Sequence, residues 1–196
     1  SISYQSPWYK EYSYIENHFA RLNTVLTRGK PCVKVGVIHP IESMWLNFGA
    51  EDKTSAVRAD MEDNFKAVIE RLLFGLIDFD FIAESQMPSL YSKTAESSLR
   101  IGVMEYDAVI VPNLITIRTS TLEILTEFKN KGGKLIFIGE CPYCVDGMIS
   151  DAVKELFQKS LYTHTASGKL LNMLSGERFL TVTNANGTPT NNFIYN

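Results

Sequence analysis

The sequence contains one pair of cysteines with the spacing of a thiol–disulfide motif, Cys141-Pro142-Tyr143-Cys144. That chemistry needs the first thiolate at a helix N-terminus, where the helix dipole lowers its pKa. Gly147 follows closely and interrupts any helix that starts here, and no second CxxC or His pair is present to complete a zinc site. We therefore expect these cysteines to pack in a loop. We expect Cys32, at the head of a predicted buried strand, to be a small core residue.

A Cys–His pair for amide hydrolysis is the second candidate. Cys141 follows a predicted strand and His164 lies downstream, but the stretch Tyr162-Thr163-His164-Thr165-Ala166 has no acidic residue to orient the imidazole. Glu140 and Pro142 flank the cysteine, where a strand-to-helix elbow requires small residues. We assign no catalytic residue from this pattern. A self-contained small-molecule enzyme of amidotransferase-like or flavodoxin-like fold remains an alternative function.

Three carboxylates, Glu42, Glu84 and Glu140, follow predicted strands. Glycoside hydrolysis uses two carboxylates on opposite sides of the scissile bond, but each of these taken alone is typical of a solvated loop. Trp45, in the segment that follows the first predicted strand, offers a ring that a sugar can stack on. We therefore name His39, Glu42 and Trp45 as candidate substrate-binding residues, with no catalytic residue, no metal ligand and no cofactor.

Composition excludes several classes of function. The 196 residues are 45% hydrophobic and 21% charged, with a formal net charge of −3, which is ordinary for a globular domain and argues against a nucleic-acid surface. The longest apolar stretch, residues 72–82, is broken by a glycine and two aspartates and is too short to span a membrane. No glycine-rich phosphate loop follows the first predicted strand, which argues against a dinucleotide or P-loop site. The compartment, cytoplasmic or periplasmic, is left open.

Hydrophobic periodicity predicts alternating strands and helices. The strands are expected at residues 32–38, 80–83, 106–111 and 134–139, with a short edge strand at 99–103; the helices are expected at 13–28, 58–76, 120–131 and 150–158, with a weaker helical stretch at 168–174. This alternation predicts an α/β fold, a three-layer flavodoxin-like parallel sheet of order 2-1-3-4 with flanking helices. A long loop is expected at residues 39–57. Asn186-Gly187 predicts a short C-terminal β hairpin with strands at 179–183 and 192–195.

The chain is expected to have three parts: an N-terminal junction segment and helix (1–29), the flavodoxin-like (amidotransferase-like) α/β domain (30–176) and a β-hairpin tail (177–196) that begins a truncated β domain. The helix at 13–28 carries an apolar stripe, and the aromatic residues before it, including Trp8, are expected to pack on a neighbour. The two ends of the sequence suggest a piece excised from a longer chain.

Residues 12–40 resemble a segment of large bacterial glycoside hydrolases. The matching features are Tyr12, Phe19-Ala20-Arg21-Leu22, Gly29-Lys30-Pro31 and the strand Val33–Pro40. In this respect the chain is similar to family 106 α-L-rhamnosidase-like proteins and to relatives classed as β-galactosidases. The α/β unit that follows resembles the β-galactosidase trimerisation domain, which is related in fold to class I glutamine amidotransferases but lacks their catalytic residues.

The resemblance implies a non-catalytic role. In such enzymes the catalytic acids lie in a barrel upstream, so no catalytic residue is carried onto this chain. The implied function is that of an α/β domain of a larger hydrolase, serving scaffolding, oligomerisation or bordering of the sugar site. The implied partners are the upstream barrel, a downstream β domain, further copies of the chain and carbohydrate, with no nucleic acid and no membrane. A sugar-binding module that uses Trp45 is a third possibility.

Overall fold

The computed structural model describes residues 3–93 and 96–190 and divides the chain into two compact units, residues 1–32 and 33–196. The first unit holds η1 (Tyr9–Glu11) and α1 (Tyr12–Leu26). The predicted apolar stripe of α1 is present, but its side chains, such as Phe19, are exposed, and none on the helix is buried. Cys32 is also exposed, so the prediction of a buried core cysteine is wrong, because the strand begins only at Val35.

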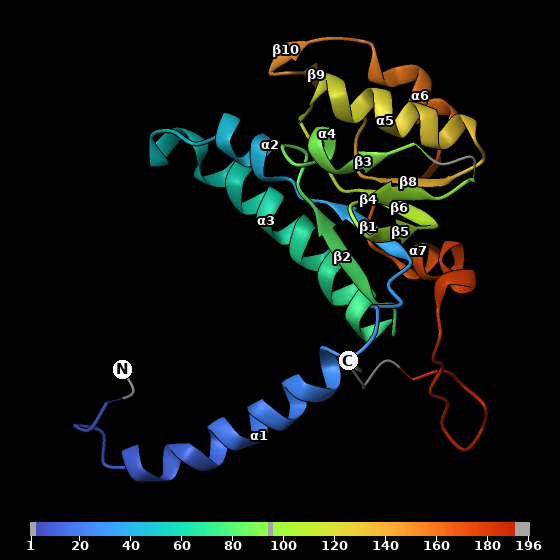
Figure 1. Cartoon of the computed structure of the whole chain (residues 1–196). Helices are drawn as coiled ribbons and strands as arrows, with labels where there is room; N and C mark the ends of the chain where they lie inside the picture. The colour runs from blue at the N-terminus through green and yellow to red at the C-terminus, as the bar shows by residue number, and fades with distance from the viewer. Residues whose placement is uncertain (1–2, 94–95, 191–196) are drawn as a thin grey trace. The chain divides into compact units, whose positions relative to one another are not determined.

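The second unit is built on a five-stranded parallel sheet of order β2-β1-β6-β8-β11 (Figure 1). Its strands are β1 (Val35–Ile38), β2 (Phe79–Ile82), β6 (Ala108–Val111), β8 (Lys134–Ile138) and β11 (Leu161–Thr163). All four pairings are parallel, and β1 aligns Val35 with Phe79 on one side and with Ala108 on the other. The predicted flavodoxin-like order is therefore confirmed, with one further strand at the edge.

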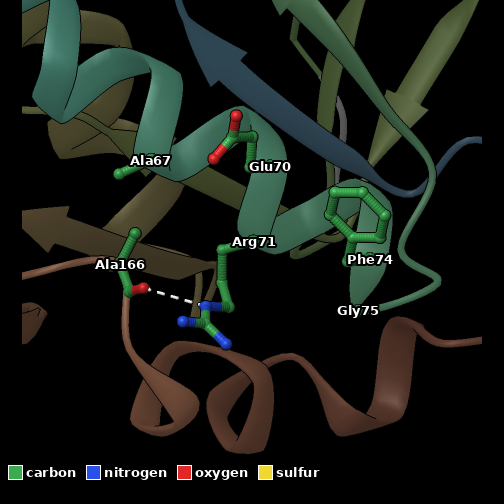
Figure 2. Close-up of a pocket in the computed structure, with 6 residues that line it drawn as sticks. All are labelled: Ala67, Glu70, Arg71, Phe74, Gly75 and Ala166. Carbon is green, nitrogen blue, oxygen red and sulfur yellow. Dashed lines mark hydrogen bonds between the residues drawn. The ribbon is translucent and has the colours of Figure 1, made fainter. Parts of the chain in front are cut away.

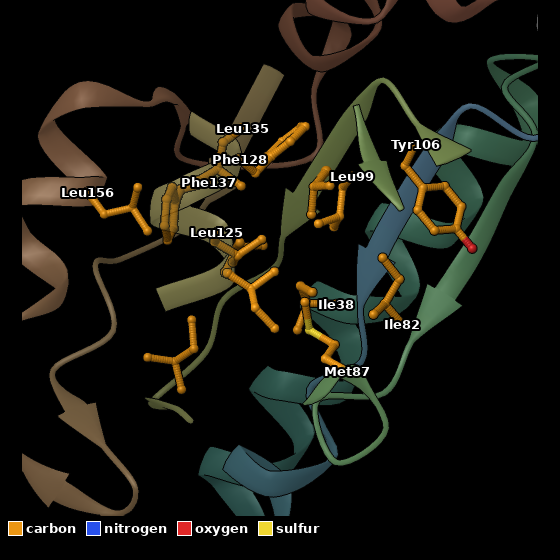
Figure 3. Close-up of a cluster of buried hydrophobic side chains, with 14 of the residues drawn as sticks. Ile38, Ile82, Met87, Leu99, Tyr106, Leu125, Phe128, Leu135, Phe137 and Leu156 are labelled. Atoms are coloured by element: carbon orange, nitrogen blue, oxygen red, sulfur yellow. The ribbon is translucent and has the colours of Figure 1, made fainter. Parts of the chain in front are cut away.

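The sheet is buried on both faces because its central strands are continuous runs of apolar residues. Successive side chains alternate between two clusters: Val109 and Val111 face one, whereas Ala108 and Ile110 face the other. The first cluster, shown in Figure 3, is covered by α4 (Met87–Leu90), α5 (Thr119–Asn130) and α6 (Val153–Lys159). The second is covered by α3 (Glu51–Phe74) and α7 (Gly168–Met173). Helix, sheet and helix thus form three layers.

Two small sheets and two short elements complete the unit. An antiparallel sheet joins β3 (Tyr91–Ser92), β4 (Leu99–Ile101) and β5 (Met104–Tyr106). A second small sheet joins β7 (Thr116–Ile117), β9 (Cys144–Val145) and β10 (Met148–Ile149). α2 (Ile41–Leu46) follows β1, and η2 (Ser175–Glu177) follows α7. Every helix within residues 3–93 and 96–190 is too short or too polar to cross a membrane.

The predicted loop at residues 39–57 is wrong, because most of it is helical. α2 occupies residues 41–46, and α3 begins at Glu51 rather than at residue 58. The first buried residue of α3 is Met61. Its N-terminal turns therefore carry no apolar stripe, and periodicity could not reveal them. Glu51 and Asp52 in the first turn favour the start of the helix through the helix dipole.

The starts of two helices and one further strand also differ from the prediction. α5 begins at Thr119, with Arg118 as its N-cap, rather than at residue 120, and α6 begins at Val153 rather than at residue 150. β11 was not predicted, since its three residues give no periodic signal. In the tail, the predicted strand at 179–183 is wrong: these residues form one antiparallel bridge, Thr183 to Pro189, beside a turn at 184–188. The predicted strand at 192–195 lies outside the described residues.

Substituting Leu72 tests the packing of α3 against the sheet. Leu72 is fully buried in the cluster that contains Leu170 and Leu174. Leu72→Ala should lower the free energy of unfolding by about 2–5 kcal/mol, because it removes apolar contacts and leaves a cavity. Val57→Ala, at an exposed position of the same helix, is the matched control and should change it by less than about 0.5 kcal/mol. Urea unfolding of both variants measures the difference; equal effects would contradict this packing.

Candidate functional site

The carboxyl ends of β1 and β6 form the point where the strand order of the sheet reverses. The strand after β1 is added on one side of the pair, and the strands after β6 are added on the other. In open α/β sheets, ligands bind in the crevice beyond such a switch point. The segments that reach this crevice are α2, which follows β1, and β7, which follows β6. A ligand bound at this switch point would therefore contact α2 and β7.

The hydroxyl of Ser43 links the two segments that border this crevice. Ser43 is buried on α2, and its Oγ accepts hydrogen bonds from the backbone N–H groups of Ile115 (3.0 Å) and Thr116 (3.1 Å). The same hydroxyl donates to the carbonyl of Thr116 at 3.2 Å. A serine hydroxyl has one hydrogen to donate and two lone pairs to accept with, so all its capacity is used. Ser43 therefore holds α2 against β7 and is not a free nucleophile.

Arg118 is fixed by two of the strand-end glutamates. Its backbone N–H donates to Oε2 of Glu84 at 2.8 Å, and its Nε–H donates to Oε1 of Glu42 at 2.6 Å. Glu84 follows β2 and is buried, and this burial raises the pKa of its carboxyl group, with the negative charge of Glu42 acting in the same direction. Two carboxylates that the sequence analysis singled out thus meet at one arginine, where they hold the start of α5.

Asp146 holds the same helix start from the opposite side. Its Oδ1 accepts from the backbone N–H of Thr119 at 3.1 Å, and its Oδ2 accepts from the Thr119 hydroxyl at 2.5 Å. These hydrogen bonds lower the pKa of Asp146. Asp146 and Gly147 both have positive φ and form the two-residue turn between β9 and β10. The sequence analysis missed Asp146, although Asp-Gly is a strong signal for such a turn.

A cavity of about 400 Å³ lies where these segments meet. It is lined by residues from α2, the β7–α5 junction and the β9–β10 turn: Glu42, Trp45, Leu46, Thr116, Arg118, Asp146 and Gly147. Glu42 and Trp45, both named as candidates, therefore share one cavity. Its size lies within the range of roughly 300–1,000 Å³ that is usual for small-molecule sites. It is the candidate functional site of this chain.

His39, the third candidate, belongs to a different environment. Its ring packs edge-on against Phe65 (5.5 Å between ring centroids) and Phe81 (5.7 Å). Burial lowers its pKa, which favours the neutral imidazole. His39 thus packs among aromatic residues on the α3 side of β1 and β2 and does not line the cavity.

The cysteine motif lacks the geometry for redox or nucleophilic chemistry. Cys144 is buried in β9, and burial raises the pKa of the Cys141 thiol, which disfavours the thiolate. The Cys141 Sγ lies 3.6 Å from the carbonyl of Pro142, and the His164 ring is hydrogen-bonded to the Tyr162 hydroxyl. Within the part of the chain that the structure describes, no group of three His, Cys, Asp or Glu residues is placed to hold a metal ion.

A second cavity of about 390 Å³ lies between α3 and the segment before α7. Figure 2 shows Arg71 extending from α3 towards Ala166, whose carbonyl accepts from Nε–H at 3.0 Å. Glu70 and Phe74 line the same space. This hydrogen bond links α3 to the residues that enter α7, so we assign Arg71 a structural role.

Comparison of the sequence with known protein families and with curated proteins gives no match. The fold is similar to two solved β-galactosidases. The β-galactosidase from Bacillus circulans sp. alkalophilus matches 74% of this chain with a TM-score of 0.51 and 14% identity. Gan42B, a GH42 β-galactosidase, matches 76% with a TM-score of 0.52 and 14% identity. The chain spans about a fifth of each, 19%. At this identity the likeness shows a shared α/β fold.

Removing the Ser43 hydroxyl should loosen the junction between α2 and β7. Ser43→Ala leaves the buried backbone N–H of Thr116 and the part-buried N–H of Ile115 without their acceptor, so the free energy of unfolding should fall by about 1–3 kcal/mol. Ser89→Ala is the control, because the Ser89 hydroxyl makes an exposed hydrogen bond to Gln86. Urea unfolding measures both variants. Similar small effects would show that the junction does not depend on this hydroxyl.

Glu84 should give stability a specific dependence on pH. Its pKa in the folded chain lies above the ordinary value of 4.5, so the fold favours the protonated acid. Its contribution to stability is therefore fully present below pH 4.5 and is lost as the pH rises through the folded-state pKa. Glu84→Gln does not titrate, so the free energy of unfolding of this variant should rise relative to the parent chain over that interval.

The measurement is urea unfolding of both chains from about pH 4 to about pH 8. Glu140→Gln, which removes a carboxyl group at an exposed position, is the matched control. A Glu84→Gln curve that runs parallel to that of the parent chain would contradict a raised pKa at Glu84.

Proposed function

We propose that this chain is a non-catalytic α/β domain of a larger carbohydrate-active glycoside hydrolase of the β-galactosidase type. Its role is scaffolding, oligomerisation or bordering of the sugar site. The observation that carries the proposal is the fold likeness: about three quarters of this chain matches about a fifth of each β-galactosidase. A match of that proportion is what a single domain within a larger enzyme gives.

The carboxylates at the strand ends support a structural role. Glycoside hydrolysis needs one carboxyl group as acid and another as nucleophile or base, placed on opposite sides of the scissile bond. Here Glu42, Glu84 and Asp146 are each hydrogen-bonded to the start of α5, at Arg118 or Thr119. Groups held in this way position the helix, and catalysis is assigned to the rest of the parent enzyme.

The proposal also includes two more specific relationships to known protein families. The likeness of residues 12–40 to α-L-rhamnosidase-like proteins, and the relation in fold of the α/β unit to class I glutamine amidotransferases, rest on the sequence resemblance. The alternative is a self-contained small-molecule enzyme of amidotransferase-like or flavodoxin-like fold. An enzyme of the amidotransferase-like kind would need a reactive thiolate. The raised pKa of Cys141 weighs against it.

The test is hydrolysis of aryl-β-galactosides and aryl-α-L-rhamnosides by the chain of residues 1–196. We expect no release of the aryl group above that of a buffer blank, because the catalytic acids lie elsewhere in the parent protein. The same preparation should show cooperative urea unfolding, which establishes that it is folded. Turnover that is lost in Glu42→Gln or Glu140→Gln would overturn the proposal.

A further inference from the structure

We infer that the cavity bounded by α2, the β7–α5 junction and the β9–β10 turn is a subsite for a neutral sugar ring. Trp45 offers the stacking surface, and Glu42, Arg118 and Asp146 offer the hydrogen bonds. The inference rests on the proposed function, since it names the ligand class of a domain that borders a sugar site. His39 is not part of this subsite, whereas Arg118 of the β7–α5 junction and Asp146 of the β9–β10 turn are.

The charges in the cavity favour a neutral polyol over an ion. Glu42 and Arg118 form an ion pair at 2.6 Å, so their charges largely cancel, and Asp146 leaves a single net negative charge. An anion would be repelled by both carboxylates. Sugar hydroxyls, in contrast, both donate and accept: the carboxylate oxygens can accept from them, and the terminal NH₂ groups of Arg118 can donate to them.

Trp45 gives the cavity an apolar wall. Its side chain is 63% exposed although it lines the cavity, and Leu46 beside it on α2 is 52% exposed. Exposed tryptophan is costly to solvate and is a usual contact surface at binding sites. The C–H face of a pyranose ring is apolar, whereas its edge carries hydroxyls. A wall of indole next to a carboxylate–guanidinium pair matches both parts of such a ring.

The polar groups of the cavity are held in place before any ligand arrives. Arg118 is fixed through its backbone by buried Glu84, and Asp146 is fixed by Thr119. The backbone N–H of Gly147 donates to the Thr116 hydroxyl at 3.0 Å, which ties the β9–β10 turn to β7. Such pre-organisation lowers the entropy lost on binding. A carboxylate has more acceptor sites, and a guanidinium more N–H donors, than these hydrogen bonds use. The same residues can therefore stabilise the fold and also bind a ligand.

The test uses the chain of residues 1–196 with Trp8→Phe, which leaves Trp45 as its only tryptophan. Titration with D-galactose should change the tryptophan fluorescence along a saturable curve, with a Kd on the order of millimolar, as expected for one ring in an open site. Calorimetry then measures the Kd of variants that lack Trp45 and therefore give no tryptophan fluorescence. Trp45→Ala should weaken binding by about tenfold or more, because the stacking surface is lost.

Tyr143→Ala is the matched control, since it removes an exposed aromatic ring that does not line the cavity, and its Kd should stay at the value of the parent chain. The inference is overturned if galactose gives no saturable signal, if Trp45→Ala binds as well as the parent, or if sodium sulfate binds in its place. Absence of both sugar binding and aryl-glycoside hydrolysis would defeat this inference alone, whereas hydrolysis would defeat the proposed function whatever the sugar binding.

Discussion

The hydroxyl of Ser43 is the contact on which the carboxyl edge of this sheet depends. A parallel sheet with the order β2-β1-β6-β8-β11 leaves a crevice where the segments after β1 and β6 separate. Ser43 fills its hydrogen-bonding capacity with the backbone of Ile115 and Thr116 across that crevice. α2 is thereby held against β7, and Glu42 and Trp45, on either side of Ser43 in α2, line the neighbouring cavity.

The same edge shows how acidic residues can position the start of a helix. Glu84 and Asp146 accept hydrogen bonds from the backbone N–H groups of Arg118 and Thr119, the N-cap and the first residue of α5. Glu42 pairs with the guanidinium group of the same arginine. Each bond satisfies a backbone or guanidinium donor at a helix N-terminus, where negative charge is favourable. Strand-end carboxylates in this fold therefore contribute to the position of α5 and to the shape of the cavity beside it.

Much of the fold could be predicted from the sequence, because buried parallel strands are continuous apolar runs and their helices carry a clear stripe. β6 and α5 are examples of both signals. The start of α3 could not be predicted, since its first turns bury nothing, and β11 is too short to give a pattern. In the site, Glu42 and Trp45 were found as strand-end and aromatic residues. Arg118 was missed because only the tertiary fold brings it to them.

The most direct test of the account is an NMR map of D-galactose binding to the ¹⁵N-labelled chain of residues 1–196. We expect chemical-shift changes confined to the cavity: at the indole N–H of Trp45 and at the amides of Glu42, Thr116, Arg118 and Gly147. The amides that surround Cys141 and His164 should not move. Shifts centred on that cysteine and histidine, with none at Trp45, would contradict the account, because they would place the ligand where an amidotransferase-like enzyme would hold it.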